Sequence, residues 1–175
     1  MGLRPLKCEC SGLANFLSET DSLTANICPD CKLNGSAFNF SWQTSGHSFN
    51  ATKINRPECF EIGSRKYLQV CGRGDGTIPI DVNVITFENW MFTLQLIENE
   101  NGEPFLITWV NGSLESEEGI SSAFFGWELR PNDLSITPCN PLPTFTSATV
   151  PAAQKSITKN TKITFINGKL DKKES

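Results

Sequence analysis

The chain has 175 residues, a net charge of −4 at neutral pH and a hydrophobic content of 38%, with twelve Phe and four Trp but only two Met. This length suits one domain, and a composition rich in aromatic, Gly and Pro residues is typical of an all-β fold. The acidic balance argues against nucleic acid or an anionic membrane as a partner, because both select a basic face. No apolar run is long enough for a membrane-spanning helix, so we expect no membrane insertion.

The first seven residues lack the apolar stretch of a secretory signal peptide, so we expect no such signal at this end of the chain. Two close cysteine pairs follow, Cys8 with Cys10 and Cys28 with Cys31. Their spacing fits a four-thiolate zinc site, and it fits equally two disulfides that cross between the pairs. Reduced thiols are a third alternative, and the redox compartment decides among the three. In each case we expect a structural role.

The first half of the chain predicts three strands with a polar loop between them. Residues 13–18 are a candidate strand, and Asn34-Gly35 is a turn signal. Residues 37–42 then alternate, which puts Phe38, Phe40 and Trp42 on one face. Residues 43–58 are polar and predict a loop, and residues 67–71 predict a short strand.

The second half predicts a meander with period-two patterning. Ile80, Val82 and Val84 alternate with polar residues, and residues 90–97 should turn Trp90, Phe92, Leu94 and Leu96 inward. Residues 105–110 return between two Asn-Gly turns, at 101–102 and 111–112. Residues 123–129 and 134–137 supply further strands.

These elements predict an all-β fold, a two-sheet antiparallel β-sandwich of about eight to ten strands. We divide it into a cysteine-clamped segment (1–36), the sandwich body (37–139) and a Pro/Thr-rich extension (140–175). Residues 161–167 form one more amphipathic strand, and we expect this C-terminal arm, through Ile163 and Phe165, to add to a sheet edge of a neighbouring subunit.

The remaining cysteines allow one more bridge. Cys59 and Cys71 flank a predicted hairpin and could form a disulfide. Cys139 is then the unpaired seventh cysteine, available to a partner chain or buried as a thiol.

Several other motifs have a functional and a structural interpretation. Arg73-Gly74-Asp75 lies in a predicted Gly-rich loop and could bind an integrin, although such turns are common between strands. Asp75 and Asp81 are too few oxygen donors for calcium. Four glycosylation sequons begin at Asn34, Asn39, Asn50 and Asn111, and without a signal peptide we interpret them as chance.

No catalytic set is evident, so we expect no enzyme. His47, the only histidine, lies in a polar loop away from any nucleophile motif. The acids near the meander turns read as solvated loop ends; they are Glu98, Glu100, Glu103, Glu115, Glu117 and Glu118. Among the tryptophans, Trp42, Trp90 and Trp109 suit a core, whereas Trp127 follows Gly126 near a strand end and is the best candidate for an exposed binding residue.

One segment carries a resemblance. Residues 27–42, with Cys28-Pro-Asp-Cys31 and Asn34-Gly35 before a strand, are similar to a C-x-x-C-x-x-Asn-Gly strand entry of small β domains, some of them in tailed-phage structural genes. The close pair Cys8 and Cys10 and the late Cys139-Asn140 fit the same pattern over residues 8–140. The resemblance implies a structural protein and no activity.

We therefore expect a non-enzymatic subunit of a virus particle, in a tailed phage a capsid decoration protein or a neck, tail or baseplate component. Its partners would be other virion proteins in an oligomeric assembly, with no cofactor except the possible zinc. The alternative is a secreted or cell-surface binding module that recognises a glycan or a receptor.

Overall fold

The computed structural model describes residues 7–80, 82–113, 120–139, 146–147, 161–166 and 169–174, and they are almost entirely β-strand. The first half forms β1 (Cys10–Leu17), β2 (Asp21–Ile27), a 3-10 helix η1 (Pro29–Cys31), β3 (Ala37–Trp42), β4 (His47–Ile54), β5 (Glu58–Ile62) and β6 (Arg65–Ile80). The second half forms β7 (Asn83–Asn99), β8 (Phe105–Ser113), β9 (Ile120–Glu128), β10 (Leu134–Pro138), β11 (Thr146–Ser147), β12 (Thr161–Ile166) and β13 (Lys169–Glu174). The all-β prediction is confirmed.

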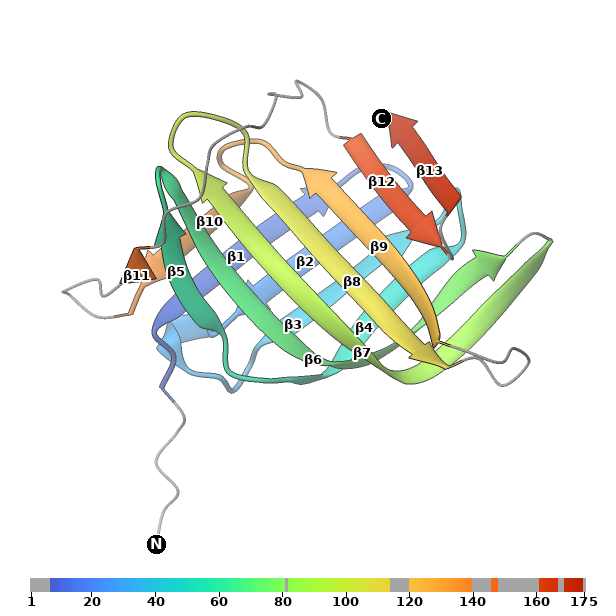
Figure 1. Ribbon diagram of the computed structural model, residues 1–175, viewed down its shortest axis with the longest axis horizontal. Helices are drawn as coiled ribbons and strands as arrows, with labels where there is room; N and C mark the ends of the chain where they lie inside the picture. Colours follow the sequence, from blue (N-terminus) through green and yellow to red (C-terminus); the bar gives the residue numbers. More distant parts are fainter. Residues whose placement is uncertain are drawn as a thin grey trace, which may run out of the picture.

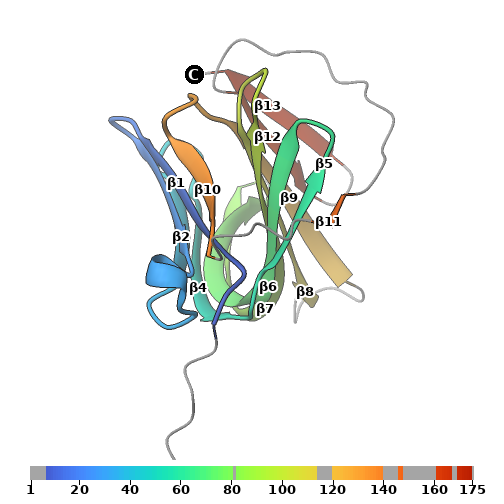
Figure 2. The same ribbon diagram turned by 90° about the vertical axis from the view of Figure 1, so that its left-hand side faces the viewer.

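The strands belong to one sheet that curls into a half-barrel and is antiparallel except for the short parallel pair β5–β11. Along the sheet the order is β10-β1-β2-β3-β4-β6-β7-β8-β9-β12-β13, with β5 beside β6 and β11 beside β5. Figure 1 shows β5–β9 in front and β1–β4 with β10 behind, and Figure 2 shows the curl from the side. The separate second sheet of a sandwich is not found, because the long strands β6 and β7 run through both layers.

The curl is set in the middle of β6. The first part of this strand pairs with β5 and the second part pairs with β4. A Cβ atom on Gly72 would collide with the carbonyl oxygen of Lys53 and lie 2.6 Å from the Phe92 ring, and one on Gly76 would lie 2.7 Å from the Phe87 ring. These glycines therefore let backbone and aromatic rings approach closely where the sheet bends. The predicted Gly-rich loop at residues 71–76 is wrong, since the segment is strand.

Aromatic side chains fill the interior between the two layers. The rings of Phe40 and Phe125 lie 4.8 Å apart, and those of Trp42 and Trp127 lie 5.1 Å apart, joining β3 to β9. A fully buried side chain of this kind contributes about 1.5–3 kcal/mol. The predicted inward positions in β3 and in residues 90–97 are confirmed, since all of them are buried; they are Phe38, Phe40, Trp42, Trp90, Phe92, Leu94 and Leu96.

Three local predictions are wrong. Residues 43–58 are not one loop, because His47 and Phe49 turn inward and Asn50 outward in β4. Asn111-Gly112 does not end a strand; β8 continues to Ser113, and a Cβ atom on Gly112 would lie 2.5 Å from the Trp90 ring.

The third concerns Ile80 at the end of β6 and Val82 and Val84 at the start of the β7 side of the hairpin. Val82 is 96% exposed and Val84 is 61% exposed, so their alternation does not mark a buried face. The register pairs Pro79 with Val84, beyond the last buried pair of the hairpin.

The strand near the C-terminus pairs within its own chain. β12 lies between β9 and β13, with Ile163 opposite Gly126 and Phe165 opposite Phe124. We expected this strand to add to a sheet edge of a neighbouring subunit. In the structure it pairs instead with β9 of its own chain. Residue 167, the end of the predicted arm, lies outside the described residues.

Candidate functional site

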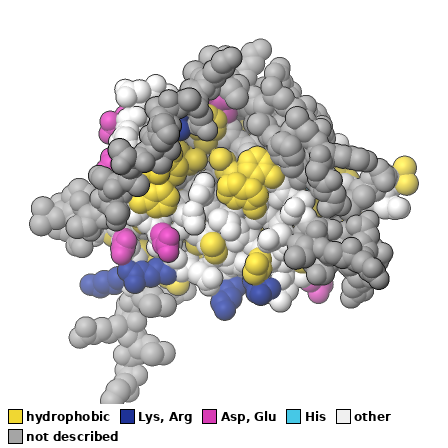
Figure 3. All heavy atoms as spheres, in the orientation of Figure 1, with side chains coloured by type: hydrophobic (Ala, Val, Ile, Leu, Met, Phe, Trp, Pro, Cys, Tyr) yellow, Lys and Arg dark blue, Asp and Glu magenta, His cyan; other side chains and the backbone are white. Residues whose placement is uncertain are grey.

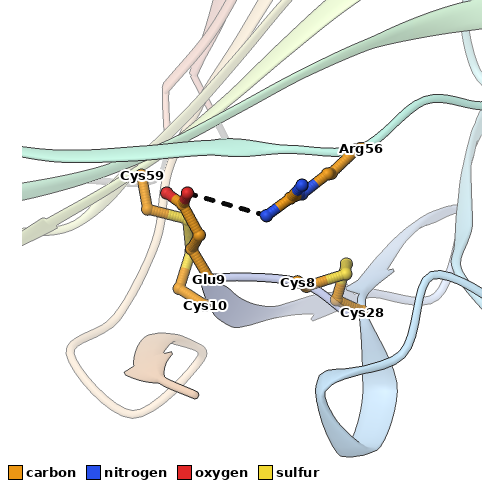
Figure 4. A network of polar contacts seen from close by, with 6 residues as sticks. All are labelled: Cys8, Glu9, Cys10, Cys28, Arg56 and Cys59. Carbon is orange, nitrogen blue, oxygen red and sulfur yellow. Dashed lines mark ion pairs between the residues drawn. A yellow bond between two sulfur atoms is a disulfide. The ribbon is translucent and has the colours of Figure 1, made fainter. Parts of the chain in front are cut away.

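Three disulfides tie the layers together at one end. They join Cys8 to Cys28, Cys10 to Cys59 and Cys31 to Cys139, with Cα–Cα distances of 6.2, 6.3 and 5.6 Å, all within the usual range for the bond. Figure 4 shows the first two on either side of Glu9, whose carboxylate lies 3.6 Å from the Arg56 guanidinium. The bridges place the protein in an oxidising, extracellular or secreted environment.

This pairing replaces the zinc alternative. Cys8, Cys10, Cys28 and Cys31 are all bridged, and only the Cys8–Cys28 bond crosses between the two close pairs. In the part of the chain that the structure describes, no group of three or more His, Cys, Asp and Glu residues could hold a metal ion.

The predicted Cys59–Cys71 disulfide is wrong, and Cys139 is not the unpaired cysteine. The β5–β6 register puts Cys59 opposite Leu68, three residues short of Cys71. Cys59 points into the core, where it meets Cys10, whereas Cys71 is exposed and free. The Cys71 thiol lies 3.6 Å from the Thr93 hydroxyl on the neighbouring strand.

The Arg73-Gly74-Asp75 tripeptide has a structural use. The Arg73 guanidinium donates a hydrogen bond to the Asn89 carbonyl at 2.9 Å, and the Asp75 carboxylate accepts one from the Asn89 N–H at 2.8 Å. Asn89 has a left-handed backbone (φ 57°) beside an irregularity in the β6–β7 register. Both charged side chains therefore hold this bulge in place, within a strand that is paired on both sides.

Trp127 is buried rather than exposed. It keeps 2% of its surface and packs against Phe40 and Trp42, both at 5.1 Å between rings. Strand alternation explains the error, since Phe125 and Trp127 share the inner side and Gly126 lies on the outer side. His47 is also in the core, with its Nδ1 2.9 Å from the Ser45 hydroxyl and its ring edge-on to Trp42.

Glu98, predicted to be a solvated loop residue, closes the edge of the half-barrel. Its Oε2 accepts a hydrogen bond from the Ile136 N–H of β10 at 2.6 Å, and its Oε1 lies 3.8 Å from the Lys66 ammonium. Pro138, at the end of the same strand, has no N–H. The edge of β10 therefore presents few free donors to another chain. Glu115, Glu117 and Glu118 lie outside the described residues.

The candidate site is the outer side of the front layer, which we call the outer aromatic face. Its apolar members lie on β5–β9 and are Phe60, Tyr67, Met91, Ile97, Phe105, Ile107, Trp109 and Phe124. Figure 3 looks onto this side of the molecule and shows hydrophobic side chains at its centre. Trp109 is 40% exposed and Met91 is 51% exposed, so the prediction that Trp109 belongs to the core is wrong.

Register explains why these side chains gather. Tyr67, Ile97 and Phe105 lie opposite one another on successive strands, and so do Thr93, Trp109 and Phe124. The Phe60 and Tyr67 rings stack at 5.0 Å, and the Trp109 and Phe124 rings lie 5.2 Å apart. Cross-strand aromatic pairs of this kind stiffen a sheet surface.

The polar groups of this face include a hydrogen-bonded pair of glutamines and a buried glutamate. The Gln95 amide donates to the Gln69 amide oxygen at 2.7 Å. At the end of β9, Glu128 is 2% exposed, and neither carboxylate oxygen has a hydrogen-bond partner among the residues that the structure describes. Burial, and secondarily the negative charge of Glu103, raise the pKa of Glu128 above the usual glutamate value.

The outer side of β2–β4 is different, and we call it the outer polar face. Apart from the exposed Lys53 near the end of β4, it carries small uncharged side chains: Ser22, Thr24, Asn26, Ala37, Asn39, Ser41, Ser48, Asn50 and Thr52. Their partners across the strands are alike, with Ser22 opposite Ser41 and Asn39 opposite Asn50.

Sequence reasoning missed the outer aromatic face because β8 is apolar on both sides. Phe105, Ile107 and Trp109 are as hydrophobic as Leu106 and Val110, so the core side cannot be chosen by composition. The one polar residue among them, Thr108, suggests that its side of β8 faces solvent, whereas that side faces the core. Thr108 is fully buried, and its hydroxyl donates to the Thr93 carbonyl at 3.0 Å.

Comparison of the chain with protein-family models, with curated proteins and with solved structures finds no match. Across the described ranges, no helix is long and apolar enough to cross a membrane. The functional argument therefore depends on the geometry of the two outer faces.

Proposed function

We propose that this chain is a non-enzymatic binding module that works in an oxidising, extracellular environment and contacts a partner protein through the outer aromatic face. The observation that carries the proposal is the exposure of Trp109 and Met91 among the outward apolar side chains of β5–β9. Apolar patches of this kind on a soluble domain mark interaction sites. Aromatic residues and Met are also enriched at the centres of protein interfaces.

A protein partner suits this face better than a glycan. Sugar recognition needs polar groups around an aromatic platform, yet the Gln69 and Gln95 side chains are hydrogen-bonded to each other. On the outer side of β8, Ile107 lies between Phe105 and Trp109, and Ile97 of β7 lies opposite Phe105, so the surface has a mixed aliphatic and aromatic shape. Such a surface fits the apolar centre of a protein interface.

The virion-subunit expectation stays a prediction, and two observations favour the extracellular module instead. Particles assembled in a reducing cytosol favour free thiols or zinc, whereas six of the seven cysteines here are bridged. The arm on which the assembly argument rested pairs with β9 of its own chain.

Site-specific photocrosslinking tests the proposal. A photoreactive phenylalanine analogue replaces Trp109 in one variant and Thr24, on the outer polar face, in a matched control. The variants are added to the extracellular surface or fluid where the protein occurs, and adducts are identified by mass spectrometry. We expect one protein adduct at position 109 and none at position 24. Equal labelling at both positions, or none at 109, contradicts the proposal.

A further inference from the structure

The three disulfides change the interpretation of the four glycosylation sequons. Sequons are modified in the secretory pathway of eukaryotic cells, which is also a compartment where disulfides form. The chain carries six bridged cysteines, so the interpretation of the sequons as chance loses its main support. Their positions in the fold then decide which asparagines could carry a glycan.

The four asparagine side chains differ in exposure. Asn34 is exposed in the turn before β3, and Asn50 is exposed in the middle of β4 on the outer polar face. Asn39 and Asn111 are half-buried in β3 and β8. Among the described residues, none of these four amides makes a side-chain hydrogen bond, so substitution at Nδ2 would break no contact of the fold.

The neighbours of each asparagine separate the sites further. Asn39 lies directly opposite Asn50, where cross-strand Cβ atoms are about 5 Å apart. Two core sugars cannot both stand over the sheet at that spacing. Asn111 lies between Met91 and Ser122 at one end of the outer aromatic face. A glycan there would cover part of the proposed binding surface.

The surroundings of Asn50 accept a sugar well. Its neighbours on β2–β4 are small uncharged Ser, Thr, Asn and Ala side chains, and the one charged residue directly opposite it is Asp75 of β6. Their hydroxyl and amide groups are both donors and acceptors, as the hydroxyls of a glycan are. Thr52, the third residue of this sequon, is exposed, and its hydroxyl donates to the Arg73 carbonyl at 3.3 Å.

We propose that Asn34 and Asn50 carry N-linked glycans, and that the glycan on Asn50 covers the outer polar face. The amide nitrogen of each asparagine attacks C1 of an oligosaccharide held on a lipid pyrophosphate. The N–C1 bond forms, the C1–O bond to the pyrophosphate breaks, the amide nitrogen loses one proton, and the lipid pyrophosphate leaves. No electron is exchanged. The proposal shares the secretory environment with the proposed function, and only the expectation of an unmodified Asn111 rests on the outer aromatic face.

The test is peptide mapping of the protein isolated from the cells that produce it. Enzymatic release of N-glycans in heavy-oxygen water converts each occupied asparagine to a labelled aspartate. We expect the label at residues 34 and 50 and intact asparagine at 39 and 111. An unlabelled residue 50 overturns the proposal, and a label at residue 39 together with residue 50 overturns the spacing argument.

A pair of variants separates the glycan from the fold. In a eukaryotic secretion host, Thr52→Ala keeps Asn50 but removes the sequon, and Thr52→Ser keeps the sequon. We expect the first variant alone to lose one glycan in mass from the secreted protein. Equal masses for both variants contradict the proposal. The intact mass after glycan release also reports the three disulfides, so a missing glycan is distinguishable from a protein that never entered an oxidising compartment.

Discussion

The two outer faces of the half-barrel are made of the same backbone and carry opposite surfaces. β2–β4 present Ser, Thr and Asn to solvent, whereas β5–β9 present Phe, Tyr, Trp, Ile and Met. Both layers already bury an apolar inner side, so folding does not require a second one. The difference supports our two proposals, a partner protein on the outer aromatic face and a glycan over the outer polar face.

Both faces depend on a scaffold that holds them in place, and removing the Cys10–Cys59 bond should destabilise that scaffold strongly. This bond closes a loop of 49 residues between β1 and β5. We expect the Cys10→Ser, Cys59→Ser variant to lose about 4 kcal/mol of unfolding free energy, because its unfolded chain gains freedom. Denaturant titration measures the loss. Cys71→Ser is the control and should unfold like the parent; a variant without the bond that also does so would refute the role of this bridge.

Two tryptophans distinguish the inner side from the outer side. Trp127→Ala should cost about 3 kcal/mol or more, because it opens a cavity against Phe40 and Trp42. Trp109→Ala, at a side chain that is 40% exposed, should cost about 1 kcal/mol or less. Thermal and denaturant unfolding of the two variants compare them directly. Similar losses for both would mean that the assignment of inside and outside is wrong.

The bend of β6 between the two layers should tolerate no added side-chain atom at Gly72. A methyl group at Gly72 collides with the Lys53 carbonyl oxygen and the Phe92 ring, neither of which is a flexible chain end. We expect Gly72→Ala to lose about 2 kcal/mol through overpacking. Gly63→Ala is an informative control, because nothing lies within 4 Å of its Cβ position and its cost arises from its φ of 60° alone. A larger loss at Gly63 than at Gly72 would contradict the close-approach argument.

Glu128 gives the smallest effect, a dependence on pH. Its pKa is raised in the folded protein by burial and by Glu103, so the folded state binds the proton more tightly than the unfolded state. Stability should be unaffected by this group at low pH. The free energy of unfolding should then fall as the pH rises from 4.5, the ordinary glutamate pKa, through the raised pKa of Glu128 in the folded protein.

The Glu128→Gln variant should lack this fall, and Glu103→Gln should reduce it. Denaturant midpoints between pH 4 and pH 8 measure all three proteins. A parallel pH dependence in the parent and in Glu128→Gln would show that another group is responsible.

Much of the fold could be predicted because alternation is strict wherever one side of a strand is polar. Phe38, Phe40 and Trp42 in β3 were placed correctly for this reason. Alternation gives no answer in β8, where both sides are apolar. The exposure of Trp109 could therefore not be predicted. The cysteine pairing could not be predicted from local spacing either. Cys31 and Cys139 are 108 residues apart, and the order of the strands brings them together. Trp127 was misplaced because Gly126 suggested a strand end, whereas it is an outward position inside β9.

The most direct test of the account is the affinity for the protein that crosslinks at position 109. The Trp109→Ala, Met91→Ala variant should bind it about 30-fold more weakly, which corresponds to about 2 kcal/mol, because exposed aromatic and Met side chains dominate such interfaces. Its unfolding free energy should change by no more than about 1–2 kcal/mol. Thr24→Ala, on the outer polar face, should bind like the parent. Unchanged affinity in the double variant, with a correctly folded protein, would contradict the assignment of the outer aromatic face as the binding surface.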